Sequence, residues 1–552
     1  MAEKIFIGVG WPYPNGSLHL GQIAGAYLAP DIFARYHRAV GNRVLMVSGS
    51  DQHGTPITVR AEQEGRTPQE VASGFHEEFV ESWKRLGIGF DLYTTTGTEN
   101  HIKTVQDMFL RLKERGDIYP QQMTLPFCVQ EQRFLLDRYV EGKCPFCGDE
   151  GARGDQCDAC GRILDPVDLI NPHCRFDGSV PETRESEHFF LRLSAYNDRL
   201  KQWLSTDKEF WRRHVLGFAL GVLHEGLRDR AITRDLTWGI PIPVPGYDDK
   251  RIYVWFENII GYLSASKEWA QSRGEPEAWR EYWQDPDCKS YYFIGKDNIW
   301  FHTLNWPAQI MGYGGLNLPY DVPANQYLNF RGGKASTSRG TAPFLPLYLD
   351  RYDADAIRYY LTAIMPENAD SDFSEEDLVR RNNEELVSTW GNLANRVLTF
   401  TYRNFAGRVP DPGQLTHADE ALLHGAESML QSVGESIAAC HFRDGLHAAF
   451  LFARDVNRYL DQEAPWKTLG TDRPSAARSL YTALGAIEAL KVALYPYLPF
   501  SSQRLHEYLG HADGVVAGGW RVQPPVAGTP LTQPQPLFKK LDALEVEEAS
   551  RR

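Results

Sequence analysis

The first 50 residues alternate between apolar runs and an amphipathic helical pattern, and this alternation constrains the fold more than any other feature. Residues 4–9 (KIFIGV) predict a strand, and a turn follows at WPYPNG. A helical pattern then runs from Ser17, the expected N-cap, to about Arg38, and residues 43–48 (RVLMVS) predict the next strand. Strand, helix and strand in this order predict a parallel α/β sheet that binds ligands at the carboxyl ends of its strands.

This pattern is interrupted once and then resumes. Helical patterns near 68–86 and 99–115 continue the α/β unit, whereas residues from about 118 to 240 are rich in Pro and Gly and have few strong periodicities. We interpret this stretch as an inserted domain. The runs IYVWF (252–256) and YYFI (291–294) predict strands in the second half of the same sheet.

Composition limits the location of the chain and the ways in which it binds partners. The formal net charge is -14, which disfavours indiscriminate binding to polyanions but is compatible with an RNA bound by a local basic patch. No basic and apolar leader opens the sequence, and no stretch has about 18 consecutive apolar residues. We therefore expect a cytoplasmic protein without a membrane span.

Residues 16–22 (GSLHLGQ) join the first predicted strand to the first predicted helix. Unpaired N–H groups and the helix dipole at such a junction favour phosphate. His19 is placed to donate to a phosphoryl group, and Gly21 leaves space for a flat base. The competing interpretation is a structural histidine in a Gly-rich turn. The position at the end of the first strand favours the phosphate site.

A second polar loop, GGKASTSRG (332–340), carries a lysine flanked by glycines and hydroxyl side chains. Such a loop is able to close over a triphosphate, where Lys334 would neutralise charge in the transition state. Taken alone, the segment is typical of an ordinary flexible loop. Its place between the second half of the sheet and the helical region favours the catalytic interpretation.

Four of the eight cysteines, Cys144, Cys147, Cys157 and Cys160, form two C-x2-C pairs within one short window. This spacing is typical of tetrahedral coordination by thiolates and predicts one zinc ion per chain. Four thiolates leave no open position on the metal, so the zinc is expected to be structural.

A second, altered pair of knuckles flanks the first. Cys128 is followed three residues later by Glu131, and Cys174 is followed three residues later by Asp177. Each pair has one carboxylate where a second thiolate would complete a knuckle. The sequence leaves open whether these four residues bind a second metal.

The C-terminal third changes character from about residue 375. Helical patterns at 375–404, 418–436, 440–462 and 475–497 predict a helix bundle. The expected fold class is thus α/β: a Rossmann-like catalytic domain with a parallel sheet, an inserted zinc-knuckle domain, and an all-α bundle. The expected boundaries are 1–117 (first half of the catalytic domain), 118–240 (insert), 241–374 (second half, with the KASTS loop), 375–508 (bundle) and 509–552 (irregular wrap and tail).

Several longer motifs carry a family resemblance along nearly the whole chain. They are VGWPYPNGSLHLGQ, GSDQHGTP, EGKCPFCG…RGDQCDACG, AITRDLTWG, YVWFENIIGYLS, FIGKDNIWFH, QYLNFRGGKASTSRG and RYYLTAIMPE. Together they resemble the methionyl-tRNA synthetases, and most of all the archaeal and eukaryotic branch of this class I family. The resemblance implies that methionine is activated with ATP and Mg²⁺ as an adenylate and then ligated to tRNA(Met).

The resemblance also implies roles for individual residues. Asp51 would pair with the substrate ammonium, and Arg234 would lie near its carboxylate. Aromatic and apolar walls suit a thioether, although ordinary core packing is the competing interpretation. The implied amino-acid site is Gly10, Trp11, Tyr13, Asp51, Arg234, Trp255, Asn258, Ile259, Tyr262 and His302; the ATP site is Gly21, Gly295, Lys296, Asp297 and Lys334; the catalytic residues are His19, Gln22, Lys334 and Arg339.

In the helical region, the resemblance implies that Asn392, Arg396 and Trp466 read the anticodon. An amide and a guanidinium recognise base edges, and an indole stacks on an unpaired base. Packing between helices is the competing interpretation of the same three residues.

The chain also departs from the family pattern at the expected site. Gln22 replaces the last residue of the HIGH motif, and Ala335 and Thr337 replace the Met and the second Lys of KMSKS. Glu257 lengthens a usual Asp. Larger residues stand in the pocket at Trp11, Asn258 and Ile259.

These departures keep other functions open. One is a paralogue of specialised metabolism that activates a smaller or more polar amino acid for a small nucleophile, for example in N–N bond formation, with a separate cupin-type partner. Another is an RNA-binding protein without activity, which the retained His19, Asp51, Arg234 and Lys334 disfavour. We favour the ligase that charges tRNA(Met) with methionine.

Overall fold

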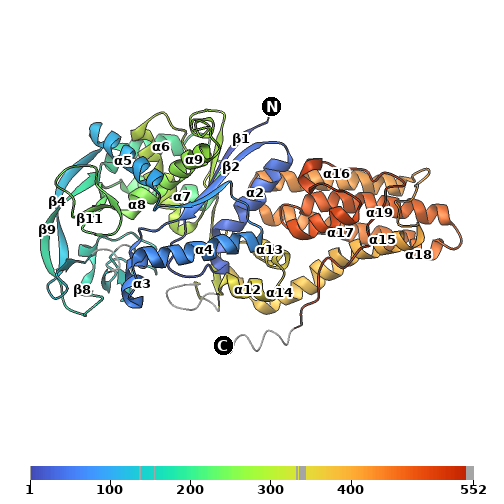
Figure 1. Cartoon of the computed structure of the whole chain (residues 1–552), viewed down its shortest axis with the longest axis horizontal. Coiled ribbons are helices and arrows are strands. Elements are labelled where there is room, and N and C mark those ends of the chain that lie inside the picture. The colour runs from blue at the N-terminus through green and yellow to red at the C-terminus, as the bar shows by residue number, and fades with distance from the viewer. Residues whose placement is uncertain (1, 136–138, 155, 331–332, 335–342, 543–552) are drawn as a thin grey trace.

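The computed structural model describes residues 2–542 except 136–138, 155, 331–332 and 335–342. A parallel five-stranded sheet lies at the centre of the N-terminal body, in the order β15-β14-β1-β2-β3 (Figure 1). Its strands are β1 (Lys4–Val9), β2 (Arg43–Ser50), β3 (Leu92–Thr95), β14 (Lys289–Gly295) and β15 (Ala324–Asn325).

The central strands are continuous apolar runs because both faces of the sheet are covered. Ile5 and Ile7 of β1 belong to the core on one face, whereas Phe6 points to the core on the other. The first face is covered by α2 (Leu28–Ala39), α4 (Pro68–Leu86) and α13 (Ala354–Ala363), and the second by α5 (Glu99–Glu114), α9 (Gly261–Ser272) and α11 (Trp306–Tyr313).

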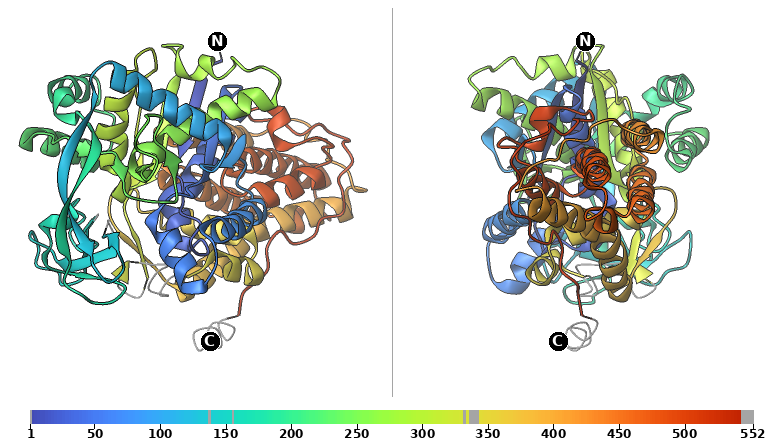
Figure 2. Two further views of the ribbon diagram at one scale, coloured as in Figure 1. Left: turned by 60° about the vertical axis from the view of Figure 1, so that its left-hand side comes forward. Right: turned by 90° about the vertical axis from the view of Figure 1, so that its right-hand side faces the viewer.

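The insert is built on a long antiparallel ribbon. Strands β4 (Ile118–Cys128) and β9 (Glu182–Leu191) pair along their length, and Figure 2 shows this ribbon at the side of the molecule away from the bundle. The remaining elements of the insert are β5 (Arg133–Phe134), β6 (Val140–Lys143), β7 (Ala152–Arg153), β8 (Ile170–Cys174), α6 (Asn197–Leu204), α7 (Arg213–Glu225) and β10 (Arg230–Ala231).

The strand predicted at 252–256 is wrong. Only β13 (Arg251–Ile252) is extended there, and it pairs antiparallel with β11 (Thr233–Arg234) and β12 (Ile240–Pro241). Tyr253 then caps a helical stretch. A short apolar run fits a buried helix as well as a buried strand, and here the helix forms. This stretch comprises α8 (Val254–Glu257), η5 (Asn258–Ile260) and α9.

The C-terminal part is a helix bundle, as predicted from the sequence. Its helices extend away from the sheet along the long axis of the molecule (Figure 1). The bundle comprises α14 (Glu375–Arg381), which continues through the π-helix η9 (Asn382–Gly391) into α15 (Asn392–Asn404), then α16 (His417–Ala438), α17 (Phe442–Glu463), α18 (Pro465–Thr468), α19 (Arg473–Leu494) and α20 (Pro499–Tyr508).

A buried arginine joins the bundle to the catalytic body. Arg358 of α13 donates to Asp31 Oδ2 of α2 at 2.7 Å and to the carbonyl oxygens of Pro496 and Tyr497 at 2.8 Å each. One hydrophobic cluster runs through both parts. The fold class is therefore confirmed. Within the described residues, no helix is both long enough and apolar enough to cross a membrane.

Candidate active site

A cavity of about 370 Å³ opens where β1 and β14 end, at the edge of the sheet where parallel strands present their ligand sites. It brings together residues that are far apart in the sequence. The predicted site residues on its walls are Gly10, Trp11, Tyr13, His19, Gly21, Gln22, Trp255, Asn258, Ile259, Tyr262, Gly295, Asp297 and His302.

His19, and not the predicted Ser17, is the N-cap of the first helix. Its Nδ1 accepts from the backbone N–H of Gln22 at 3.2 Å, and Gln22 Oε1 accepts from the backbone N–H of His19 at 3.0 Å. This reciprocal pair orients the imidazole at the cavity wall. A Cβ at Gly21 would lie 2.9 Å from His19 Nδ1, so only glycine fits there.

The described segments on either side of residues 335–342 lie beside His19. Leu328, at the start of β16 (Leu328–Phe330), lines the cavity, and the backbone of Lys334 in β17 (Gly333–Lys334) pairs with β16. Beyond the loop, the carbonyl of Pro343 accepts from Leu20 N at 2.9 Å. Arg339 and residues 335–338 lie outside the described residues.

Asp51, at the end of β2, lies behind the cavity wall and not on it. Asn258 Nδ2, whose residue does line the cavity, donates to Asp51 Oδ2 at 3.0 Å. The other oxygen, Oδ1, is buried and has no hydrogen-bond partner among the described residues. Burial, and secondly the charge of Glu257, raise the pKa of the Asp51 carboxyl well above its ordinary value.

Arg234 does not lie on the same wall. Its guanidinium donates to the carbonyls of Ala231 and Thr233 at 3.0 Å each, and it lies 4.0 Å from the ring centroid of Tyr253. It lines an adjoining cavity of about 50 Å³. Tyr253 and Trp255 line both this cavity and the larger one. The structure therefore places Arg234 on the smaller cavity and Asp51 behind the wall of the larger one, so the expected pair does not share a wall.

Trp11 forms one wall of the cavity and is wedged between two glycines. A Cβ at Gly49 would lie 2.4 Å from the indole, and one at Gly261 would lie 2.8 Å from it. The buried Trp11 Nε1 has no hydrogen-bond partner among the described residues. The large side chain is accommodated because both neighbours lack one.

Tyr262 and His302 form a buried pair beside Trp11, whose ring centroid lies 6.5 Å from that of Tyr262. His302 Nδ1 donates to the carbonyl of Asn298 at 2.9 Å, so its Nε2 is the acceptor for the Tyr262 hydroxyl at 2.8 Å. Burial lowers the pKa of His302 to about 4, and the ring is neutral at pH 7. This side of the cavity is uncharged and suits an apolar substrate group.

Lys296 and Asp297 follow β14 at the other end of the cavity. The Lys296 ammonium pairs with Asp370 Oδ1 at 2.7 Å and lies 3.7 Å from the ring centroid of Tyr327. Asp297 lines the cavity and accepts a hydrogen bond from the Tyr327 hydroxyl. Lys296 itself is not on the wall, so the structure separates two neighbours that the resemblance implied as one ATP site.

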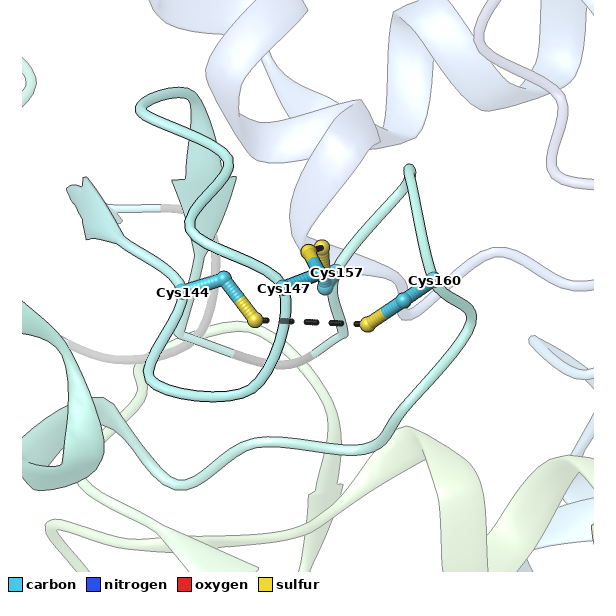
Figure 3. Close-up of side chains that lie close together, drawn as sticks. All are labelled: Cys144, Cys147, Cys157 and Cys160. Carbon is cyan, nitrogen blue, oxygen red and sulfur yellow. Dashed lines mark hydrogen bonds between the residues drawn. The ribbon is translucent and has the colours of Figure 1, made fainter.

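The four predicted zinc ligands converge, as Figure 3 shows. All four Sγ atoms lie within 4.8 Å of one another; Cys144 and Cys160 are 4.0 Å apart, and Cys147 and Cys157 are 3.6 Å apart. Four thiolates about 2.3 Å from a tetrahedral zinc would be about 3.8 Å apart, so the cluster fits this ion.

The second pair of knuckles is only partly assembled. The thiols of Cys128 and Cys174 and the carboxylate of Asp177 lie together, and Cys128 Sγ donates to Asp177 Oδ2 at 3.1 Å. Glu131, which the sequence left open as a ligand, does not join them, because its carboxylate pairs with Arg133 at 2.8 Å. The carboxylate is drawn to the guanidinium charge, and three potential ligands remain.

Sequence reasoning missed several residues of the cavity. Gln156 and Asp158 lie on either side of the zinc ligand Cys157 and bring the knuckle to the wall. Their position beside a ligand was the only signal in the sequence, and it did not show which way the knuckle faces. The other unpredicted wall residues include Tyr27, Asn298, Phe301, Gln326 and Tyr327.

The three predicted anticodon residues lie on the exposed surface of the bundle. Arg396 lies 4.8 Å from the ring centroid of Trp466, and its Nη2 donates to Asn457 Oδ1 at 3.1 Å. Asn392 lies one turn earlier on α15 and is exposed. A stacked arginine and indole with exposed edges form a surface that suits unpaired bases.

Two family models match the chain. The model of the class I tRNA synthetases (M) matches residues 5–398, and that of the anticodon binding domain of methionyl tRNA ligase matches residues 409–552.

Relatives and solved structures agree with these models. The methionine–tRNA ligase of Dehalococcoides mccartyi is 56% identical over 552 residues and covers 100% of both chains. That of Thermomicrobium roseum is 49% identical over 579 residues, with 100% of this chain and 99% of the relative covered. The crystal structure of Mycobacterium tuberculosis methionyl-tRNA synthetase bound by methionyl-adenylate aligns with a TM-score of 0.80 at 26% identity, over 97% of this chain and 100% of that one.

These comparisons correct three expectations. The relatives are bacterial, so the placement nearest the archaeal and eukaryotic branch is not supported. A KMSKS loop that diverges from the family is likewise not supported. Nothing in the comparisons supports a cupin-type partner.

Proposed function

The chain belongs to the class I methionyl-tRNA synthetases, and on this premise we propose that its cavity activates methionine with ATP and passes the methionyl group to tRNA(Met). The enzyme is an AMP-forming ligase. In the first step, the methionine carboxylate attacks the α-phosphorus of ATP and pyrophosphate leaves. In the second, a ribose hydroxyl at the 3′ end of the tRNA attacks the acyl carbon and AMP leaves.

For the first step, we assign phosphoryl stabilisation to His19, Lys334 and Arg339. The cap formed with Gln22 holds His19 at the helix start, where the dipole favours negative charge. The described segments before and after the loop residues 335–342 lie beside His19, which supports this assignment. Gly21 leaves room for the nucleotide, with Gly295 and Asp297 on the wall and Lys296 behind it.

For the amino acid, we assign the ammonium to Asp51 and the carboxylate side to Arg234. The unpartnered Oδ1 of Asp51 suits a cation. The neutral pair of Tyr262 and His302 suits a thioether, with the remaining walls supplied by Gly10, Trp11, Tyr13, Trp255, Asn258 and Ile259.

Two metal ions belong to this proposal. The cluster of Cys144, Cys147, Cys157 and Cys160 would hold one zinc that folds the insert and takes no part in the chemistry. ATP would enter as its magnesium complex, which neutralises phosphate charge. Because translation in the cytoplasm consumes charged tRNA and releases it uncharged, we propose that the enzyme works there.

The observation that carries the proposal is the single cavity shared by the capped His19, the anchored start of the lysine loop and the uncharged pocket of Tyr262 and His302. The biosynthetic alternative is not favoured, because the full-length relatives are methionine–tRNA ligases and the bundle keeps its exposed Arg396 and Trp466.

The test is pyrophosphate exchange over all amino acids, followed by charging of tRNA(Met). Methionine should support exchange far better than any other amino acid, and the tRNA should be charged. Exchange with a different amino acid and no charging would overturn the proposal.

A further inference from the structure

A buried network of hydrogen-bonded side chains lies next to Asn258, behind the cavity wall. The Glu257 carboxylate is bonded on one oxygen to His53 Nδ1 at 2.9 Å and on the other to His101 Nε2 at 2.6 Å. His101 Nδ1 contacts the Ser264 hydroxyl at 2.8 Å. These residues come from the segment after β2 and from α8, α5 and α9, so the network connects four parts of the catalytic body.

The two imidazoles decide the charge state of Glu257. The carboxylate is fully buried, and burial works to raise its pKa, but the neighbouring His53 and His101 outweigh this and lower it. An ionised carboxylate only accepts, so each imidazole presents an N–H to it. The negative charge of Glu257 is therefore held by its two partners and not offered to the cavity.

Asn258 connects this network to the cavity. It follows Glu257 directly, at the turn from α8 into η5, and its side-chain amide donates to Asp51 Oδ2 at 3.0 Å. Among the described residues, the other oxygen of Asp51, Oδ1, has no partner that meets the hydrogen-bond geometry. A buried acceptor without a partner costs about 1–3 kcal/mol, and a substrate donor would remove that cost.

We propose that Glu257, held between His53 and His101, and Asn258 are positioning residues that aim the open oxygen of Asp51 at the substrate ammonium. The inference rests on the proposed function and states how the site selects an α-amino acid. Glu257 fixes the turn, Asn258 restrains one oxygen of Asp51, and the other oxygen is left as the acceptor for the substrate ammonium, whose positive charge would favour the ionised carboxylate.

The test compares two ligands that differ only at the ammonium. Calorimetry would measure the Kd of methionine and of its deamino analogue, which keeps the thioether and the carboxylate. Asn258→Asp puts a second carboxylate against Asp51, and Asn258→Ala removes the donor. Each should weaken methionine binding by about tenfold, since the lost alignment is of the order of one charged hydrogen bond, while the analogue changes by less than about threefold.

Glu257→Gln tests the role of the buried Glu257 through steady-state kinetics. It should raise the KM for methionine but not for ATP, and it should shift the pH profile of kcat/KM for methionine, because the charge beside Asp51 is gone. Glu257→Asp should restore part of the effect. The matched control is Glu268→Gln on α9, whose carboxylate accepts from Thr94 Oγ1 at 2.9 Å away from the cavity.

Loss of affinity for both ligands to the same extent, or for neither, would overturn the positioning role. If a Glu257 variant does not fold, as judged by thermal unfolding, the two Asn258 variants decide the question. Failure of the proposed function is separate, because the wild-type chain would then show no methionine-dependent exchange whatever the variants bind.

Discussion

At the scale of single residues, the shape of the cavity depends on contacts that no local pattern encodes. Trp11 is accommodated because Gly49 of β2 and Gly261 of α9 present bare backbone to its indole. Gly49 also faces Thr94 of the neighbouring strand, whose carbonyl oxygen would lie 2.5 Å from an added Cβ.

Gly49→Ala should therefore displace Trp11 into the cavity. Overpacking of this kind costs about 1–3 kcal/mol in stability, and the KM for methionine should rise by about tenfold. Gly217→Ala, at a helical glycine with open space around it, is the control; it should leave the KM unchanged and raise stability by about 0.5–1 kcal/mol. Methionine-dependent exchange and urea unfolding check both, and an unchanged KM would contradict the wedge.

His302 makes stability depend on pH in a defined window. Its folded pKa of about 4 lies below the ordinary 6.5, so the unfolded chain binds the proton first. Above about pH 6.5 this histidine therefore costs no stability, and the free energy of unfolding falls as the pH drops from 6.5 toward 4. Between pH 7 and pH 5, protonation of His302 in the unfolded chain should lower the free energy of unfolding by about 2 kcal/mol, at 1.36 kcal/mol per unit of pKa.

His302→Gln should abolish that share of the acid sensitivity. The difference in the free energy of unfolding between pH 7 and pH 5 should be smaller in the variant by about 2 kcal/mol. Urea unfolding at both pH values measures it. Equal pH dependence in the two proteins would show that folding does not lower the pKa of this ring.

Where chemistry and chain position coincide, the structure places predicted site residues on the cavity, and their roles stay predictions. His19 and Gln22 were found in a motif after the first strand, and both line the cavity. Arg234 lies against Tyr253 in a separate space, because its position depends on how β11 packs and not on any local spacing.

At the scale of elements, the zinc knuckle is both a folding unit and part of the cavity wall. Cys157 is buried in a small cluster with Cys144 and neighbouring apolar residues, and Gln156 and Asp158 on either side of it reach the cavity. Backbone N–H groups outweigh burial and lower the pKa of Cys144 to about 7, which favours the thiolate.

Zinc removal should thus lower activity without unfolding the sheet. Cys157→Ser should reduce bound zinc well below one per chain, loosen the insert and slow exchange by at least about tenfold, because a structural zinc supplies folding energy directly. Elemental analysis, circular dichroism and exchange measure the three effects. Cys288→Ala, at a buried cysteine outside the cluster, should retain both zinc and exchange. Full exchange without zinc would contradict the coupling.

Secondary-structure prediction from the sequence was accurate for long elements and not for a short one. The long amphipathic helices of the bundle were predicted with small errors at their ends, because a period of 3.6 residues over many turns is unambiguous. The five residues IYVWF were misassigned, because they are too short and too uniformly apolar for periodicity to separate strand from helix.

At the scale of the whole molecule, Arg358 connects the sheet helices to the bundle. Its guanidinium is fully buried and pairs with Asp31, which also accepts from Arg35 Nε at 2.8 Å. Arg358→Met should destabilise the chain by about 3–5 kcal/mol, because it leaves backbone carbonyls and part of a carboxylate without donors.

The control for this junction is Arg85→Met, which breaks an exposed pair with Asp350 and should cost about 0–1 kcal/mol. Chemical unfolding gives both values. Similar small losses for the two variants would show that the junction contributes little to stability.

The bundle should act on the tRNA and not on adenylate formation. Arg396→Ala removes the guanidinium that stacks on Trp466 at the distal surface. We expect kcat/KM for charging of tRNA(Met) to fall by about 10- to 100-fold, as the loss of one base contact of about 1–3 kcal/mol implies, and exchange without tRNA to remain unchanged. An equal loss in both assays would contradict this separation.

The amino-acid sequence by itself determined the class of fold, the helix bundle, the cysteine cluster and the motif at the first helix, because each depends on spacing within one short segment. Only the tertiary structure decided that the zinc knuckle faces the cavity, that Trp11 lies between two glycines, and that Asn258 restrains Asp51. Those arrangements depend on contacts between segments tens to hundreds of residues apart, whose distances are set by packing of the whole chain and by no local pattern.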